Sequence, residues 1–292
     1  MNILALQSLL DGLMMGGVYA LAALGLSLIF GVLKITNFAH GAMMTIGMYL
    51  VYAMSIGFGL NPYAAMPIAM AVMFLIGFLI QRFPIHSIEH APAHNQLLLT
   101  LGLAYVFENT ILVIFTPNYK TLSVRGFEKA LHLGVLTFAP ARLVAFCVVI
   151  VVTAGVYALL YRTHVGSNIR ASAQNDIGAR LMGINVRNTR AIAFGIGAVC
   201  TGIAGGLLTP IMSFYPTLGE SFQLKCFVIS VLGGMGNLWG ALLSGLLIGI
   251  IESMSGYYLG GSWSELLIYG IFILILFVRP MGLFGRRNRR EN

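Results

Sequence analysis

The sequence from residue 162 to residue 190 reads Arg162-Thr-His-Val-Gly-Ser-Asn-Ile-Arg-Ala-Ser-Ala-Gln-Asn-Asp-Ile-Gly-Ala-Arg-Leu-Met-Gly-Ile-Asn-Val-Arg-Asn-Thr-Arg190. This loop carries five arginines and separates two apolar runs of membrane-spanning length. Lys and Arg in short loops are retained on the cytoplasmic side of a membrane, so we expect the loop to face the cytoplasm. Its interior predicts a short helix with the small residues Ala173, Ala179 and Gly183 on one side. Such a helix is expected to dock a partner.

The composition around this loop is that of an integral membrane protein. Of 292 residues, 58% are hydrophobic and 9% are charged, whereas soluble domains carry roughly 25% charged residues. The net charge is +8. A basic cluster follows the last apolar run and consists of Arg279, Arg286, Arg287, Arg289 and Arg290. Such a cluster is typical of a topology anchor or a contact with anionic lipids, so we expect membrane lipids as partners and no nucleic acid.

Eight apolar runs predict membrane-spanning helices, because a span needs about 20 mostly apolar residues. They are Gly12–Leu33, Ala42–Leu60, Tyr63–Gln81, Gln96–Phe115, Leu143–Tyr161, Ala191–Leu208, Leu238–Ser255 and Leu266–Val278. Phe222–Gly234 is apolar but short, so it is either a half-helix or a span broken by residues 233–237. We therefore predict an all-α polytopic membrane protein of about 8–9 transmembrane helices, with broken or re-entrant segments near 34–41 and 222–237.

The positions of the basic residues predict the orientation. We expect a single domain over residues 1–292, made of an N-terminal half (1–161), a cytoplasmic loop (162–190), a C-terminal half (191–285) and a basic cytoplasmic tail (286–292). Counting crossings back from the loop puts Lys34 and residues 82–95 inside and Lys120, Arg125, Lys129 and Arg142 outside. The N-terminus is then periplasmic and the C-terminus cytoplasmic, with 12 of 17 basic residues inside.

The outside stretch Thr116–Pro140 is the longest polar connection, and we expect a short helix or a hairpin in it. A connection of this length usually has a function. It either contacts an external partner or simply covers the helix ends.

Two interruptions of the apolar pattern echo each other. Residues 32–42 read Val-Leu-Lys-Ile-Thr-Asn-Phe-Ala-His-Gly-Ala, and residues 231–241 read Val-Leu-Gly-Gly-Met-Gly-Asn-Leu-Trp-Gly-Ala. Matching interruptions in two halves of a transporter indicate a central site, where half-helix ends face the substrate and can steady a carboxylate. We therefore place Asn37, His40, Gly41, Asn237 and Trp239 on a candidate substrate pathway.

Each of these side chains has a structural interpretation as well. Asn37 and Asn237 are more often caps of a broken helix than substrate ligands, and we favour capping. His40 is either a gating residue or, as we favour, an interfacial residue beside Lys34, and Trp239 is also suited to be an interface anchor. Glu108, the sixth pathway candidate, is an acid inside an apolar run. Intramembrane acids usually face a cavity or a partner, but a role in helix packing is equally compatible with its position.

Catalytic and cofactor motifs are missing from the sequence. The dipeptide Gly-Lys does not occur, so there is no phosphate-binding loop for ATP. His86, His90 and His94 recur at four-residue spacing, which can bind a metal on a helix. Pro84 and Pro92 disfavour a continuous helix there, so we interpret the stretch as a solvated inner loop. We expect no enzymatic activity, no metal and no cofactor bound by this chain.

Three segments together resemble the permeases of branched-chain amino acid ABC importers, of the LivH type. They are Leu-Ser-Leu-Ile-Phe-Gly-Val-Leu-Lys-Ile-Thr-Asn-Phe-Ala-His-Gly at residues 26–41, the Arg-Ala-Ser-Ala-Gln-Asn-Asp stretch that starts at residue 170, and residues 231–241. The likeness extends from Leu9 to Gly282. It implies a multi-pass subunit of the bacterial inner membrane that imports branched-chain or other hydrophobic amino acids.

The resemblance also implies partners. They are a homologous LivM-type permease, two cytoplasmic ABC ATPases that bind ATP-Mg, and a periplasmic substrate-binding protein. Residues 170–183 match the segment that couples such permeases to the ATPase, and we call them the coupling segment. By this match Ala173, Ala179 and Gly183 allow close approach, and Arg170, Asn175 and Asp176 supply polar contacts.

Other functions remain open on the sequence alone. The same architecture also handles urea, short amides and other amino acids. An ion-coupled secondary transporter or a channel needs intramembrane acids as ion sites, and Glu108 and Glu252 are few for that.

Overall fold

The structure is a computed structural model, and it describes residues 3–89, 91–124, 126–127, 129–134, 136–279 and 281–285. Its long helices are α1 (Ile3–Leu33), α2 (His40–Phe58), α3 (Pro62–Ile80), α4 (Ala93–Phe115), α5 (Pro140–Arg162), α8 (Val186–Leu208), α10 (Leu238–Leu259) and α11 (Gly261–Val278). The shorter elements are the π-helical turn η1 (Gln81–Ile85), α6 (His164–Gln174), α7 (Asp176–Leu181), the 3-10 turn η2 (Pro216–Leu218) and α9 (Gly219–Leu232). Strands β1 (Leu131–Leu133) and β2 (Leu136–Phe138) form an antiparallel hairpin.

The prediction of an all-α polytopic membrane protein is confirmed. Among the described residues, seven helices are long and apolar enough to cross a membrane, namely α1, α2, α3 with η1, α4, α5, α8 and α10. Each of the eight predicted runs falls in one helix, and the eighth corresponds to α11. Helix α9 has 14 residues and is therefore about 21 Å long, too short to span. Of the two interpretations of residues 222–234, the half-helix is correct.

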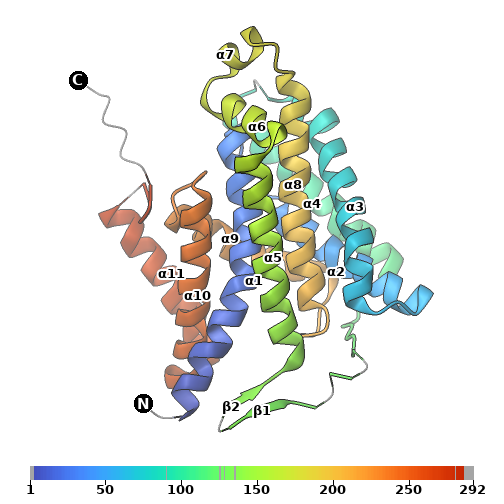
Figure 1. The fold of residues 1–292 in the computed structure, drawn as a ribbon, viewed down its shortest axis with the longest axis vertical. Helices are drawn as coiled ribbons and strands as arrows, with labels where there is room; N and C mark the ends of the chain where they lie inside the picture. The colour runs from blue at the N-terminus through green and yellow to red at the C-terminus, as the bar shows by residue number, and fades with distance from the viewer. Residues whose placement is uncertain are drawn as a thin grey trace.

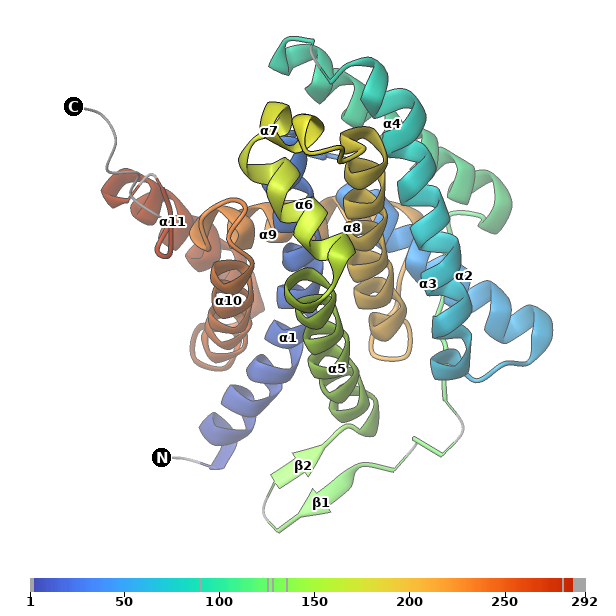
Figure 2. The same cartoon turned by 45° about the horizontal axis from the view of Figure 1, so that its top comes forward.

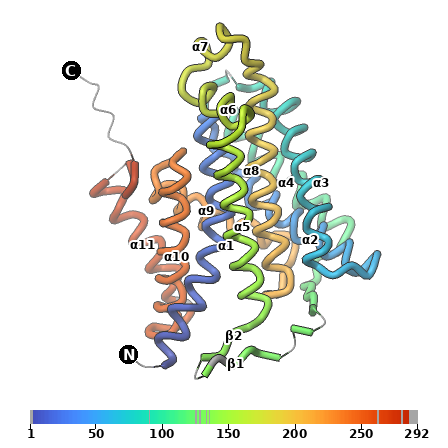
Figure 3. The backbone as a smooth tube through the Cα atoms, viewed as in Figure 1, coloured from blue at the N-terminus to red at the C-terminus, as the bar shows by residue number. Residues whose placement is uncertain are grey.

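Small residues let the two halves of the chain pack closely along α1. This helix runs the length of the bundle (Figure 3). Gly12 and Gly16 of α1 face Gly245 and Gly249 of α10, and a Cβ atom at Gly12 would lie only 2.7 Å from the carbonyl oxygen of Gly249. Inside a membrane, where lipid is as apolar as the protein, such small-residue faces are a main source of helix association. The predicted N- and C-terminal halves are therefore packed into one body.

The predicted grouping of charges matches the two ends of the bundle. The hairpin and the start of α1 lie at one end, and α6 and α7 lie across the other (Figures 1 and 2). We call these the hairpin end and the α6–α7 end. At the hairpin end Arg142 forms an ion pair with Asp11 at 3.0 Å. The backbones of Lys120 and Phe214 form an isolated antiparallel β-bridge there. Lys34 and Arg82 lie at the α6–α7 end; Arg125 lies outside the described residues. Which end faces the cytoplasm stays a prediction.

The hairpin expected within Thr116–Pro140 is present. Gln7 of α1 donates to the carbonyl oxygen of Thr137 at 2.6 Å and accepts from its backbone N–H at 3.0 Å. The hairpin is thus attached to the first helix, and its contact with an external partner stays a prediction.

Candidate functional site

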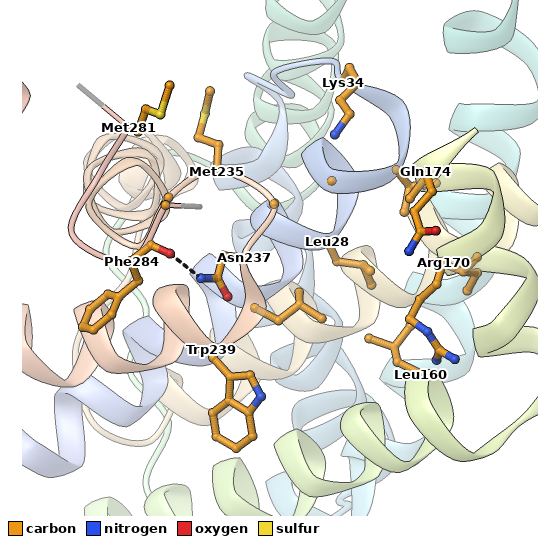
Figure 4. Close-up of a pocket in the computed structure, with 18 of the residues that line it drawn as sticks. Leu28, Lys34, Leu160, Arg170, Gln174, Met235, Asn237, Trp239, Met281 and Phe284 are labelled. Atoms are coloured by element: carbon orange, nitrogen blue, oxygen red, sulfur yellow. Dashed lines mark hydrogen bonds between the residues drawn. The ribbon is translucent and has the colours of Figure 1, made fainter. Parts of the chain in front are cut away.

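A cavity of about 940 Å³ opens near the α6–α7 end of the molecule (Figure 4). Its walls come from the end of α1, the end of α5, one side of α6, the turn at residues 233–237 and the C-terminal residues 281–285. Lys34 and Arg170 contribute two positive charges, and no acidic side chain is among the described residues that line it. An electropositive cavity of this kind attracts anionic groups such as a carboxylate.

The turn at residues 233–237 forms one wall because its sequence cannot continue a helix. Gly234 and Gly236 adopt φ angles of 81° and 88°, which favour glycine. Asn237 then caps α10, since its Oδ1 accepts from the backbone N–H of Gly240 at 3.2 Å. Its Nδ2 donates to the carbonyl oxygen of Phe284 at 2.8 Å, as the dashed line in Figure 4 shows. Capping, the interpretation we favoured for Asn237, is confirmed.

Trp239 and Tyr161 line a second wall, and Tyr157 stacks between them. Trp239 is 60% exposed, and its ring centroid lies 4.5 Å from that of Tyr157. Tyr157 stacks on Tyr161 at 5.6 Å, and the guanidinium of Arg170 lies 5.0 Å from the Tyr161 ring centroid. The cavity thus brings together Asn237 and Trp239 from the predicted pathway and Arg170 and Ala173 from the coupling segment.

Beyond Lys34, which lines the cavity, the first interruption is enclosed by protein. Asn37 is 1% exposed, and its Oδ1 accepts from the backbone N–H of Ala39 at 3.0 Å. Gln223 of α9 accepts from the backbone N–H of Gly41 at 2.7 Å and donates to the carbonyl oxygen of Asn37 at 3.2 Å. These contacts satisfy backbone groups that the break leaves free, as a membrane interior requires. The Asn37 side chain therefore closes a turn ahead of α2, whose N-cap residue is Ala39.

The interfacial interpretation of His40 is wrong. The side chain is fully buried, and its Nε2 lies 2.9 Å from the carbonyl oxygen of Ala22. The reason is that α2 begins beside the middle of α1, so that protein covers its first residue. Neither His40 nor Gly41 lines the cavity.

Glu108 lies in a third place. It is on α4, is 5% exposed and does not line the cavity. Its burial favours the helix-packing interpretation. The six residues placed on one pathway are thus divided among the cavity, the enclosed break and α4.

The coupling segment is two helices and not one. Helix α6 ends at Gln174, and Asn175 caps α7 by accepting from the backbone N–H of Gly178 at 2.9 Å. Ala179 is only 4% exposed, so it faces its own chain, and Ala173 packs partly against the core. Gly183 ends the segment with a φ of 79°. Ala173 and Ala179 therefore face the bundle while Gly183 is exposed, so the three small residues do not share one face. That they allow close approach to an ATPase stays a prediction.

Apolar side chains that the sequence analysis missed occupy the outward face. Ile177, Leu181 and Met182 are 74%, 83% and 81% exposed, and we call them the α7 apolar face. The four-residue spacing of Ile177 and Leu181 places them on one side of a helix. The sequence therefore contained a signal from which this face could have been predicted.

The comparisons with known proteins decide the family. The family described as "branched-chain amino acid transport system / permease component" matches residues 8–276. The chain belongs to this family. It is 28% identical to the high-affinity branched-chain amino acid transport system permease protein BraD of Pseudomonas aeruginosa, with 96% of each chain covered. It is 30% identical to the probable branched-chain amino acid transport permease protein LivH of Methanocaldococcus jannaschii, over 91% of this chain and 88% of the relative.

A second type of relative is similar as well. The permease is 24% identical to the high-affinity branched-chain amino acid transport system permease protein LivM of Escherichia coli, over 91% of this chain and 67% of that protein. The predicted resemblance to branched-chain amino acid ABC permeases is therefore confirmed.

Two polar residues of the permease's coupling segment are engaged within the chain. Asp176 pairs with Arg190, and the same guanidinium pairs with Glu89. The guanidinium of Arg170 lies over the ring of Tyr161. Neither side chain is presented on the α7 apolar face.

The histidine stretch of the permease is not one helix, as Pro84 and Pro92 predicted. The π-helical turn η1 ends at Ile85 and α4 begins at Ala93. His86 contacts Glu89 at 3.0 Å, and His90 lies outside the described residues.

Proposed function

We propose that this permease is the membrane-spanning subunit of an ATP-driven importer for branched-chain or other hydrophobic amino acids in the bacterial inner membrane. Its α6–α7 end faces the cytoplasm in this proposal. Family membership supports the transport role, and the substrates named for BraD and LivH support the choice of amino acids. The aliphatic side chain of such a substrate is compatible with a pathway through largely apolar helices.

The α7 apolar face carries the proposal that the motor is a separate protein. Its three large apolar side chains are exposed, two on α7 and Met182 directly after it. Helix α7 lies across the end of the bundle (Figure 2). Exposed apolar patches on a surface that faces water mark interaction sites. The chain has no phosphate-binding loop, so ATP-Mg binds to the partner ATPases. An apolar groove in an ATPase suits Ile177, Leu181 and Met182.

The remaining partners follow from the relatives. The likeness to LivM supports pairing with a second, homologous permease. A periplasmic binding protein delivers the amino acid at the hairpin end, opposite the ATPases.

The cavity gives the amino acid its exit in this mechanism. Helix α6 lines the cavity and adjoins α7, so a displacement of α7 by the ATPase moves a cavity wall. The two sides of the membrane are then open in alternation. Lys34 and Arg170 attract the carboxylate as the substrate leaves.

The test uses the assembled complex in proteoliposomes with the binding protein outside and ATP inside. Leu181→Asp places a charge on the α7 apolar face, and we expect ATPase copurification to be lost and uptake of radiolabelled leucine to fall about tenfold or more, because removal of an anchoring contact costs ~2 kcal/mol. Val165→Asp is the matched control, since Val165 is exposed on α6 at the same end.

Two outcomes would contradict the proposal. Uptake that persists without ATPases indicates an ion-coupled transporter or a channel. If urea or short amides compete for uptake and leucine, isoleucine and valine do not, the proposed ATPase coupling stands but the proposed substrate is wrong.

A further inference from the structure

We propose that Arg190 is a positioning residue that locks α7 to the connection between α3 and α4, so that motion of α7 is delivered to α3 and α8. This inference rests on the proposed function, because α7 needs an ATPase to drive it. The lock joins the carboxylates of Glu89 and Asp176 to the guanidinium of Arg190.

The three charged groups come from three different elements. Arg190 lies near the start of α8, Glu89 belongs to the α3–α4 connection, and Asp176 is the first residue of α7. Arg190 Nη1 pairs with Glu89 Oε1, and Nη2 pairs with Asp176 Oδ2. The planar guanidinium presents its donors in a fixed fork, so one arginine can hold two carboxylates in a defined geometry. A lysine has one compact charge and cannot reproduce both contacts.

Helix α7 has few other attachments to the bundle. It is six residues long, and a helix of this length is unstable without tertiary contacts. One side carries the α7 apolar face, which is exposed, and only Ala179 is buried on the other. Asn175 breaks the chain before it and Gly183 follows it in a left-handed conformation. The ion pair with Arg190 is therefore the main directional restraint on α7.

The α3–α4 connection is fastened to α8 at a second point. Arg82 of η1 donates to Oδ1 of Asn188, and Arg187 donates to the carbonyl oxygen of Arg82 at 3.4 Å. Farther along, Gly77 of α3 lies against Gly195 and Ala198 of α8. A Cβ added at Gly77 would lie 3.1 Å from Cα of Gly195. The end of α3 and the start of α8 thus form one block, and Arg190 joins α7 to it.

The two arms of the lock differ in burial. The Glu89 side chain is 6% exposed and that of Arg190 is 9% exposed, whereas that of Asp176 is 32% exposed. Removing one member of a buried ion pair leaves an uncompensated charge, so the Glu89 arm also holds the fold. The Asp176 arm reaches solvent, and cutting it releases α7 while the buried pair stays.

The first measurement is the amount of amino acid imported per ATP hydrolysed by the complete complex. Asp176→Asn should lower this ratio about two- to fivefold, the range expected for loss of a partly exposed ion pair, with ATPases still bound. Arg190→Lys should lower the ratio to a similar extent, because the single charge of lysine can keep the buried contact with Glu89 but not the contact with Asp176 as well. Arg162→Gln is the matched control, since Arg162 is an exposed arginine at the same end with no ion pair or hydrogen bond among the described residues.

The second measurement tests the lock without transport. Spin labels at Ser87→Cys and Arg180→Cys, both exposed positions, report the distance between the α3–α4 connection and α7 in a Cys147→Ser background. We expect a narrow distance distribution in the parent and a broad one with Asp176→Asn. An unchanged distribution overturns the lock, and a broadened distribution with an unchanged transport ratio overturns its role in coupling. If the parent complex shows no ATP-driven uptake, the proposed function fails while the distance measurement still decides the lock.

Discussion

Residues 34–39 and residues 233–237 both separate two helices, yet the first interruption is enclosed by protein beyond Lys34, which lines the cavity, while the second opens onto the cavity over residues 234–237. In the first, Ile35, Asn37 and Ala39 are each at most 3% exposed. In the second, Met235 is 41% exposed, and Gly234, Gly236 and Asn237 line the cavity. The two share a sequence outline but have different surroundings.

Helix α9 explains the difference, because it touches both interruptions. Its Gln223 side chain supplies hydrogen bonds to Asn37 and Gly41, and its last residue, Leu232, leads directly into the second interruption. The enclosed break thus serves packing, and the open one forms the cavity wall.

Among the substitutions that test this contrast, Gly41→Ala should lower the free energy of unfolding the most. A Cβ at Gly41 would collide with the backbone carbonyl oxygen of Gly219, which cannot move aside as a side chain can. We expect a loss of about 3 kcal/mol in the free energy of unfolding, the upper end for overpacking, measured in micelles by SDS titration. Gly102→Ala is the control, since a Cβ there has nothing within 4 Å. Equal stability of the two variants would show that the enclosed break is not tightly packed.

Gln223→Leu should have the next largest effect. The leucine removes both hydrogen bonds and leaves the Gly41 N–H and the Asn37 carbonyl buried. Two interhelical bonds in a membrane protein are worth ~0.6 kcal/mol each on average, and buried unsatisfied groups add to this, so we expect a loss of about 1–3 kcal/mol. Gln174→Leu, which changes an exposed glutamine on α6, should leave the unfolding free energy unchanged. A neutral Gln223→Leu would mean that water or lipid satisfies the break.

Features that depend on neighbours in sequence could be predicted. The apolar runs mark the long helices, and Asn237 caps the backbone only three residues ahead, so both follow from local pattern. The hairpin within residues 116–140 and the helix break between Pro84 and Pro92 are of the same kind.

Features that depend on packing could not be predicted from the sequence. Gln223 meets Gly41 across 182 residues, and His40 is buried because α2 starts beside the interior of α1. The inward turn of Ala179 depends on how α7 packs against the bundle, which no local pattern specifies. The candidate pathway residues were therefore named as one group although the fold separates them.

The smallest effect comes from a pair of substitutions that separates the two bonds of Asn237 at the open interruption. Asn237→Ala loses the cap of α10 and the bond to Phe284, so stability should fall by about 1 kcal/mol. Asn237→Asp still accepts from the Gly240 N–H but cannot donate to Phe284, so stability should change by only ~0.3 kcal/mol, because Asp caps as well as Asn. In both variants, however, residues 281–285 lose the bond from Asn237 and keep the one from the Leu283 N–H to the carbonyl oxygen of Leu232 at 2.7 Å. A cysteine at Phe284→Cys, in a Cys147→Ser background, should then react faster with a soluble maleimide in both. An unchanged rate in Asn237→Asp would show that packing and the bond between Leu283 and Leu232 hold the C-terminal wall without Asn237, and the open turn would then be as self-contained as the enclosed one.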